Sequence, residues 1–256
     1  MKIYIYSCRK DIDYSKVFSR SASVVSNLEE ADLLVACGGD GTIVSAIHFL
    51  AKFGLWHIPV FGYNTGTLGF LSNDFDIEAV KVLLKIEHTV IQRRDLLQIN
   101  VDDKQLYAIN DVVIQPTTIG KLCEIPLILT GAMSLEEVEK SCVLYKGDGV
   151  IISTASGSTA YNLSAGGPIV APKLQALIVT PICPFSFSAR PLVLPLDIQI
   201  QVPISNHTNI TVDGVVHTTS SDVTISKAKN QIKIVKHAKF LDSIQSKLGW
   251  NTNIKN

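Results

Sequence analysis

The residues with the most distinctive chemistry form a glycine-rich turn, Cys37-Gly-Gly-Asp-Gly-Thr42, with three glycines within four positions. Glycine permits unusual backbone angles and leaves backbone N–H groups uncovered by a Cβ, so such a turn can surround an anion. The helix expected to begin near Thr42 adds its positive N-terminal end. The pattern therefore favours a polyphosphate ligand, cradled by Gly38, Gly39, Gly41 and Thr42.

Asp40 is the unusual member of this turn, because a ligand phosphate repels a carboxylate that has no role of its own. Asp40 could accept the proton of an attacking hydroxyl group, or it could help to hold Mg²⁺. The alternative is a tight turn in which Asp40 only caps the helix, and the glycines alone do not decide between these interpretations. The spacing matches neither a Walker loop nor a GxGxxG fingerprint.

The segments around the turn alternate between strand and helix patterns. Residues 31–37 form a run that is apolar except for Asp32, as in a buried parallel strand, and residues 42–52 carry apolar side chains at helical spacing. This alternation predicts an α/β domain with a doubly wound, Rossmann-like parallel sheet, whose ligands bind beyond the carboxyl ends of its strands. The other expected elements are strands at 3–6 and 57–62 and helices at 14–25 and 76–86.

From about residue 95 the pattern changes to short β-rich runs. Asp213-Gly214, between two such runs, is a hairpin signal. The pattern predicts a β-rich, sandwich-type domain at 95–236. The first domain would comprise 1–94, with an amphipathic segment at about 237–256 packing back on it. Strands are expected at 97–101, 106–114, 125–129, 149–153, 175–180, 192–202, 209–213, 222–226 and 231–235.

Composition narrows the class of protein. The chain has 23 basic and 23 acidic residues and no net charge, whereas a nucleic-acid-binding protein usually has a basic excess. Its five cysteines are scattered without CxxC spacing, which argues against a disulfide framework and a zinc site. The N-terminus does not read as a signal peptide, and the longest apolar stretch, 177–187, contains two prolines. A soluble, cytoplasmic protein that does not enter a membrane is expected.

Further segments accompany the glycine turn in the order found in a known family. GGDGT resembles the signature of a kinase superfamily that includes diacylglycerol kinases, sphingosine kinases and phosphofructokinases. The other segments resemble the NAD kinase family from about residue 32 to the C-terminus. Ala155 and Phe185 differ from the residues that the family commonly has at these positions. These differences leave open which phosphoryl donor is used and which acceptor is preferred. The matching segments are Asn64-Thr-Gly-Thr-Leu-Gly-Phe70-Leu71, Asn110-Asp111, 147–154, 157–168, Ser188-Ala-Arg-Pro191-Leu-Val and Lys247-Leu-Gly-Trp250.

The resemblance implies transfer of the γ-phosphoryl group of ATP to the 2′-hydroxyl of the adenosine ribose of NAD, at a site between the two domains. Asp40 would be the general base or would orient the hydroxyl group. Mg²⁺ or another divalent cation would arrive with ATP, and no side-chain metal ligand is assigned. The dinucleotide would contact Leu68, Phe70, Asn110, Asp111, Asp148, Ser156, Thr159, Ala160, Tyr161 and Ser164.

The family resemblance also implies a homodimer or homotetramer. Inorganic polyphosphate as donor and NADH as acceptor stay open. A lipid kinase would explain GGDGT but neither Asn110-Asp111 nor the segment 157–168. A non-catalytic dinucleotide sensor would bind NAD or NADP without phosphoryl transfer, and the presence of Asp40 in the glycine turn argues against it.

Overall fold

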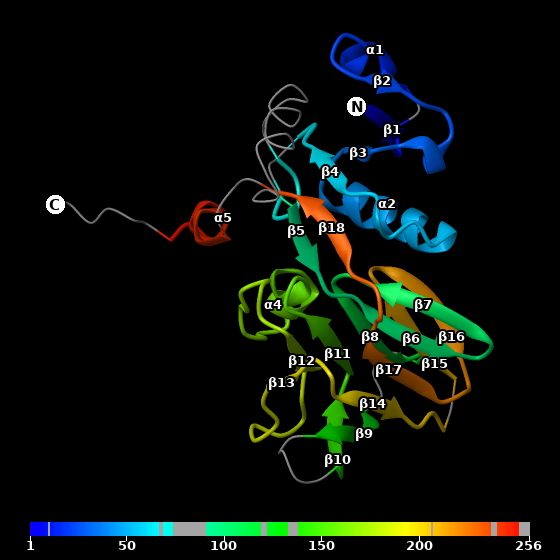
Figure 1. Cartoon of the computed structure of the whole chain (residues 1–256). Helices are drawn as coiled ribbons and strands as arrows, with labels where there is room; N and C mark the ends of the chain where they lie inside the picture. The colour runs from blue at the N-terminus through cyan, green and yellow to red at the C-terminus, as the bar shows by residue number, and fades with distance from the viewer. Residues whose placement is uncertain are drawn as a thin grey trace, which may run out of the picture. The chain divides into compact units, whose positions relative to one another are not determined.

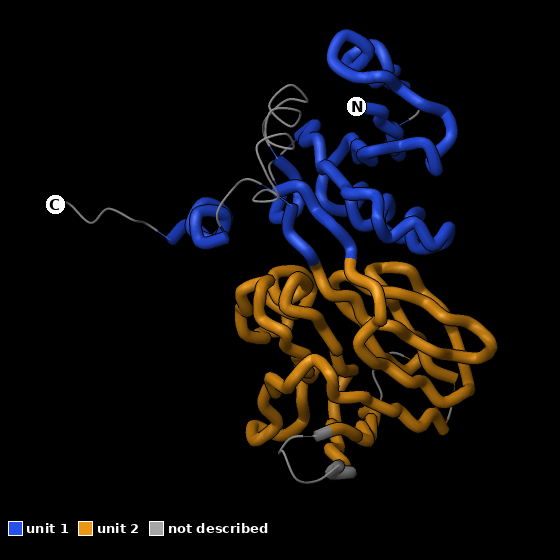
Figure 2. Tube along the Cα trace, viewed as in Figure 1, with its two compact units in different colours: residues 1–93, 232–256 blue, residues 94–231 orange. Residues whose placement is uncertain are grey.

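The computed structural model describes all residues except 10, 67–68, 74–90, 119–121, 133–137, 206, 237–239 and 251–256. The chain divides into two compact units (Figure 2): unit 1 comprises residues 1–93 and 232–256, and unit 2 comprises residues 94–231. The boundary expected from the sequence placed residues 232–236 in the second domain. They belong to unit 1 because Ile234 and Val235 pair in parallel with Val60 and Phe61.

A six-stranded sheet with the strand order β2-β1-β3-β4-β18-β5 forms the centre of unit 1 (Figure 1). The pairings β1–β2, β1–β3, β3–β4 and β4–β18 are parallel, which confirms the predicted α/β domain. Every residue of β3 is buried, because a parallel sheet is covered on both faces. The strands are β1 Lys2–Tyr6, β2 Ser23–Val24, β3 Leu33–Cys37, β4 Val60–Tyr63, β5 Ile91–Arg94 and β18 Ile232–Val235.

The main helix of unit 1 is α2, Asp40–Phe53, which starts two residues before the predicted range and ends one after it. Its apolar face packs on the sheet, and Phe49 contacts Tyr6 with ring centroids 5.3 Å apart. Gly54 ends the helix with a φ of 69°, a left-handed conformation that glycine adopts easily. The remaining elements are α1 Ser15–Phe18, η1 Leu28–Glu30 and α5 Phe240–Leu248.

Two helix predictions had other outcomes. The helix predicted at 14–25 extends only over α1, and β2 already begins at Ser23. The helix predicted at 76–86 lies outside the described residues. In the described part of the chain no helix is both long and apolar enough to cross a bilayer.

Unit 2 contains two six-stranded antiparallel sheets, β10-β9-β14-β17-β6-β7 and β13-β12-β11-β8-β15-β16. One buried apolar cluster takes Ile99 and Leu129 from the first sheet and Ile152 and Val179 from the second, which confirms the predicted sandwich-type domain. The strands are β6 Leu97–Val101, β7 Lys104–Ala108, β8 Asp111–Pro116, β9 Cys123–Ala132, β10 Val138–Gly147, β11 Gly149–Thr154, β12 Ala176–Ile182, β13 Leu192–Pro195, β14 Gln199–Val202, β15 Thr208–Val212, β16 Val215–Thr219 and β17 Val223–Lys227.

Unit 2 has two turns that carry predicted polar residues, one at Asp213-Gly214 and one at Asn110. The predicted hairpin at Asp213-Gly214 is confirmed, since Val212 pairs with Val215 and the two turn residues have φ values of 46° and 87°. The single run predicted at 106–114 is wrong, because the chain turns at Asn110 between β7 and β8. That interruption brings Asn110 to the beginning of β8.

Candidate functional site

The glycine turn of unit 1 lies at the carboxyl end of β3, directly before α2. A Cβ on Gly38 would lie 2.2 Å from Thr42 Oγ1, so internal packing requires glycine there. Gly39 and Gly41 are exposed, and a Cβ on either would meet no heavy atom within 4 Å. Internal packing therefore does not explain these two glycines, whereas a ligand that approaches the bare backbone would.

The Asp40 carboxylate is held by three main-chain N–H groups from the segment after β4. Oδ2 accepts from Phe70 at 2.6 Å, and Oδ1 accepts from Leu71 at 3.1 Å and from Ser72 at 3.2 Å. The first turn of α2 further favours its negative charge. Since a carboxylate offers about four lone-pair positions, one position stays available to a hydroxyl group.

Gly69 allows this close approach of the two segments. A Cβ at this position would lie 1.7 Å from Asp40 Oδ1, and the Gly69 N–H donates to Ser72 Oγ at 2.6 Å. Phe70, a predicted acceptor contact, therefore adjoins Asp40, and its ring centroid lies 5.1 Å from Lys247 Nζ. Leu68, the other acceptor contact predicted here, lies outside the described residues.

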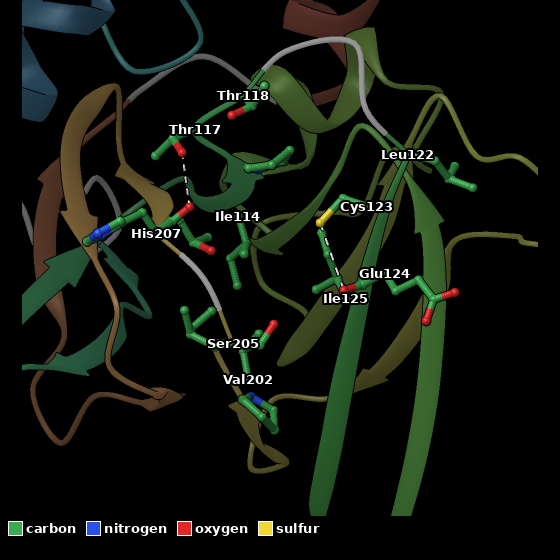
Figure 3. A pocket seen from close by; sticks show the side chains of 14 residues that line it. Ile114, Thr117, Thr118, Leu122, Cys123, Glu124, Ile125, Val202, Ser205 and His207 are labelled. Carbon is green, nitrogen blue, oxygen red and sulfur yellow. Dashed lines mark hydrogen bonds between the residues drawn. The ribbon is translucent and has the colours of Figure 1, made fainter.

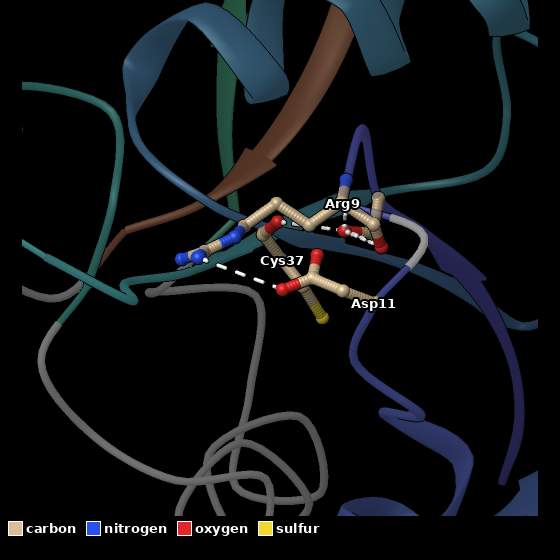
Figure 4. A network of polar contacts seen from close by, with 4 residues as sticks. Arg9, Asp11 and Cys37 are labelled. Atoms are coloured by element: carbon tan, nitrogen blue, oxygen red, sulfur yellow. Dashed lines mark hydrogen bonds and ion pairs between the residues drawn. The ribbon is translucent and has the colours of Figure 1, made fainter.

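The loop after β1 is tied to Cys37, the first residue of the glycine turn (Figure 4). Ser7 Oγ donates to the Cys37 carbonyl oxygen at 3.4 Å, and the Arg9 N–H donates to Ser7 Oγ at 3.1 Å. Burial raises the pKa of the Cys37 thiol to about 12, so this cysteine is a core residue and not a nucleophile. The turn thus begins from a braced position.

In unit 2, Asp213 organises the turn that carries Asn110 and Asp111. Its Oδ2 accepts the N–H of Ile109 at 2.7 Å, and its Oδ1 accepts those of Asn110 at 2.8 Å and Asp111 at 3.0 Å. The sequence prediction treated Asp213 only as a hairpin residue. No local pattern reveals this second role, because the partner residues lie more than a hundred positions earlier in the chain.

Asp111 is a buried acid with only 5% of its surface exposed. Burial is the main cause that raises its pKa to about 7, and the nearby Asp213 carboxylate adds to the rise. A hydrogen bond from the Tyr161 backbone acts in the opposite direction. Asp111 therefore changes charge near neutral pH, which is frequent at functional sites.

The turn that follows β11 packs directly on Asn110. Thr154 Oγ1 donates to the Ile109 carbonyl at 2.6 Å and accepts the Gly157 N–H at 3.0 Å. A Cβ on Gly157 would lie 2.0 Å from the Asn110 carbonyl oxygen, so glycine is needed for this contact. The η3 turn, Gly157–Thr159, and α4, Tyr161–Ser164, begin from this point.

This arrangement brings most of the predicted acceptor residues of unit 2 into one region. Ser156, Thr159 and Ala160 are half-buried, and Tyr161 and Ser164 are exposed. The buried Asn162, which the sequence analysis did not single out, braces the region from inside. Its Nδ2 donates to the Ser158 carbonyl at 3.0 Å, and its Oδ1 accepts from Thr180 Oγ1 at 2.6 Å.

Asp148 is the predicted site residue that this chain does not bring to the others. It precedes β11, whereas Ser153 near the other end of β11 pairs with Asp111. The five residue-to-residue steps from 148 to 153 span about 17 Å at the usual rise of a strand. Asp148 is exposed, and its N–H donates to the Ile182 carbonyl at 2.9 Å.

A hollow of about 570 Å³ also opens in unit 2 and is lined by Ile114, Cys123 and His207, among others (Figure 3). None of its lining residues is a predicted site residue. It adjoins Ile114 and Pro116, toward the end of β8 that is remote from Asp111. The hollow is therefore separate from the predicted acceptor region.

Within the described residues, no three His, Cys, Asp or Glu side chains are grouped so that they could hold a metal ion. A protein-built metal centre is thus not found in that part of the chain.

The α/β unit with its exposed glycine turn and the antiparallel β-unit with its polar turns fit a two-unit phosphotransferase that acts on an alcohol group. Comparison with known families makes this specific. Residues 5–89 match the ATP-NAD kinase N-terminal domain, and residues 109–240 match the ATP-NAD kinase C-terminal domain. The chain belongs to the NAD kinase family.

Individual relatives agree with this assignment. An NAD kinase of Bacteroides fragilis is 32% identical over 237 residues, which cover 88% of this chain and 78% of the relative. An NAD kinase of Lachnoclostridium phytofermentans is 35% identical over 250 residues, with coverage of 86% and 81%. The resemblance found in the sequence and the predicted enzyme class are thereby confirmed.

Solved structures show the same fold. An NAD kinase from Archaeoglobus fulgidus in complex with ATP superposes with a TM-score of 0.76 at 25% identity, covering 97% of this chain and 99% of that one. A yeast NADH kinase complexed with NADH gives a TM-score of 0.77 at 24% identity, with coverage of 100% and 89%.

Proposed function

We propose that this enzyme transfers the γ-phosphoryl group of ATP to the 2′-hydroxyl of the adenosine ribose of NAD and so forms NADP. The observation that carries the proposal is the Asp40 carboxylate, held by three N–H groups beside the exposed backbone of Gly39 and Gly41. Phosphoryl transfer depends mainly on positioning and on charge neutralisation, and this turn is suited to both. The curated NAD kinases that resemble this chain and the solved NAD kinase in complex with ATP support this choice of substrates.

The donor half of the proposed site consists of the glycine turn and the N-terminus of α2. Gly39 and Gly41 would direct backbone N–H groups to the phosphates, and Thr42 would direct its hydroxyl group. Gly38, which was predicted to join them, is buried and donates its N–H to the Tyr63 carbonyl at 3.0 Å, so it would shape the turn instead. Mg²⁺ would arrive with ATP, held chiefly by phosphate oxygens, and would neutralise part of their charge.

The acceptor half of the proposed site lies mainly in unit 2. The Asn110 side chain offers both a donor and an acceptor, which suits the edge of adenine, and the Asp111 carboxylate accepts from ribose hydroxyls. The small residues of the turn at 156–160 let a ligand approach the backbone closely. The full proposed set is Leu68, Phe70, Asn110, Asp111, Ser156, Thr159, Ala160, Tyr161 and Ser164, with Asp148 discussed below.

In the proposed reaction the ribose O2′ forms a bond to the γ-phosphorus while the bond from that phosphorus to the β,γ-bridging oxygen breaks. ADP leaves with the bonding electron pair. The proton of the 2′-hydroxyl passes to the remaining lone pair of Asp40. A carboxylate is a weak base in general, so the main contribution of Asp40 is to orient the hydroxyl group.

The test is a coupled assay of NADP formation with ATP or inorganic polyphosphate as donor and NAD or NADH as acceptor. We expect turnover with ATP and NAD that requires a divalent cation and stops with EDTA. Phosphorylation of diacylglycerol or a sphingoid base without phosphorylation of NAD would favour a lipid kinase. Tight NAD binding in calorimetry without any NADP formation would favour a sensor.

The charge of Asp111 gives the proposed acceptor site a pH dependence. Its pKa of about 7 means that the carboxyl is neutral below this pH and an acceptor-only carboxylate above it. Hydroxyl groups of the ribose need an acceptor, so the KM for NAD should fall as the pH rises from 6 to 8. If only the ionised form binds, the change is roughly tenfold.

Asp111→Asn, which is neutral at every pH, is expected to remove this dependence while the KM for ATP keeps its wild-type profile. Stability offers an independent check. Because the folded pKa lies above the unfolded value, ionised Asp111 destabilises the fold as the pH rises from about 4 toward 7. Asp111→Asn should therefore raise Tm by more at pH 8 than at pH 5. An unaltered NAD profile in the variant would remove Asp111 from the acceptor site.

We further propose that the enzyme is a homo-oligomer, a dimer or a tetramer. Phe185 and Phe187 are 75% and 93% exposed, and the Phe185 N–H donates to the Lys146 carbonyl, near Asp148. Exposed apolar groups of this size favour association. A second copy over this face would let Asp148 serve a site other than that of its own chain. Light scattering should give a multiple of 27.9 kDa, and a single-chain mass would contradict the proposal.

A cytoplasmic location belongs to the same proposal, because all five cysteines are free, as is usual in a reducing compartment. Fractionation of the native cells would test it.

A further inference from the structure

Lys236 is a buried lysine that directly follows β18, and only 5% of its surface is exposed. Its ammonium group donates to the main-chain carbonyl oxygen of Ser72, a residue that is itself fully buried. A buried ammonium group is unfavourable unless protein oxygens replace the lost water. The Ser72 carbonyl is one such oxygen, so the charge and the segment around Ser72 stabilise each other.

Ser72 is also one of the three residues whose N–H groups hold Asp40. The Asp40 anion therefore lies at the N–H of Ser72, and the Lys236 cation lies at its carbonyl oxygen. Each charge favours the backbone orientation that the other bond needs, and hydrogen bonds in such a chain strengthen one another. The structure thereby connects Lys236 to Asp40 through one residue.

The end of β18 holds this segment at a second point. Asn73 Nδ2 donates to the Val235 carbonyl at 2.8 Å, and the Asn73 N–H donates to the Gly62 carbonyl at 2.9 Å. Gln92 Nε2 in turn donates to the Lys236 carbonyl at 3.4 Å. The segment 70–73 is thus attached to both β4 and β18, and the Lys236 side chain supplies the charged attachment.

We propose that Lys236 is a positioning residue for phosphoryl transfer, which fixes the N–H groups of Phe70, Leu71 and Ser72 around Asp40. It does not touch the substrates in this role. The inference rests on the proposed function of Asp40. It extends that function to a residue that follows the last strand of the sheet, more than 190 positions from the glycine turn.

Lys236→Met is expected to lower kcat by roughly tenfold, because even small displacements of a reacting group reduce rates strongly, while the KM values for ATP and NAD change less than about twofold. Lys236→Gln keeps a neutral donor and should lose less activity, and Lys236→Arg keeps the charge and should recover part of it. Lys233→Met is the matched control. Lys233 lies on β18, three residues before Lys236, and donates to the carbonyl of His57 at 3.3 Å, so the activity of Lys233→Met should be that of wild type.

Amide hydrogen exchange at residues 70–72 provides a readout that is independent of catalysis. Exchange should be faster in Lys236→Met and Lys236→Gln than in Lys233→Met, at a temperature where all variants are folded. Wild-type exchange and wild-type kcat in either folded Lys236 variant would overturn the inference. Faster exchange with an unchanged kcat would also overturn it, because Lys236 would then hold the segment without serving phosphoryl transfer. The proposed role of Asp40 fails separately, if Asp40→Asn keeps a near-wild-type kcat, so the two failures can be distinguished.

Discussion

Asp40→Asn is expected to lower kcat by about three orders of magnitude, within the usual range for loss of a group that handles a proton in the transition state. The carboxamide has nearly the same size, but it cannot take up the hydroxyl proton. Its nitrogen also cannot accept the N–H groups that Phe70, Leu71 and Ser72 direct at the side chain. Steady-state NADP formation measures the loss.

Binding separates this role from a simple loss of structure. The KM for ATP and the Kd for NAD should stay within about threefold of wild type, because Asp40 is expected to act mainly in the transition state. Asp13→Asn is the matched control, since Asp13 also accepts a main-chain N–H at the start of a helix, from Ser15 at 3.1 Å. Its kcat should be that of wild type. A near-wild-type kcat in Asp40→Asn would refute the proposed role.

The elements that carry Asp40 could be predicted because their signals are local. The apolar run of β3, the helical spacing of α2 and the glycines between them lie within about twenty consecutive residues. The periodicity of such segments reflects the face that each must bury. The hairpin at Asp213-Gly214 was predictable for the same reason, since its turn requires positive φ values.

The partners of the site residues could not be predicted, because they depend on the pairing of distant strands. Asp40 meets residues 70–72 only because β3 and β4 lie side by side in the sheet. Lys236 joins the same segment because β18 pairs with β4. No pattern within a single segment contains such pairings, so the support around Asp40 appears only in the fold.

Asp148 shows the opposite problem, in which nearness in sequence is misleading. The segment from 147 to 168 looks like one continuous motif, yet β11 lies between Asp148 and the turn at 156–160. Because a strand is extended, the two ends of the six-residue strand β11 lie roughly 17 Å apart, which is about the length of a small ligand. The contact proposed for Asp148 therefore belongs with the proposed homo-oligomer, in which a second copy of the chain would supply it.

Asp213→Ala is expected to raise the KM for NAD by roughly thirtyfold and to lower Tm, because the N–H groups of Ile109, Asn110 and Asp111 lose their acceptor. Each buried donor left without a partner costs about 1–3 kcal/mol, and the turn that presents Asn110 and Asp111 would relax to avoid that loss. The KM for ATP should change little. Kinetics measured well below Tm separate the change in NAD binding from unfolding.

The same substitution should also move the pH profile for NAD. The Asp213 carboxylate contributes to the raised pKa of Asp111, so its removal should shift the midpoint from about 7 to lower pH. Asp222→Ala is the matched control, since Asp222 accepts the Ile204 N–H at 2.9 Å elsewhere in unit 2. That variant should keep the wild-type KM and midpoint for NAD. If folded Asp213→Ala protein also kept the wild-type KM and midpoint for NAD, the prediction would be contradicted. The turn at 109–111 would then keep its shape without the Asp213 carboxylate, and other residues would support the acceptor site.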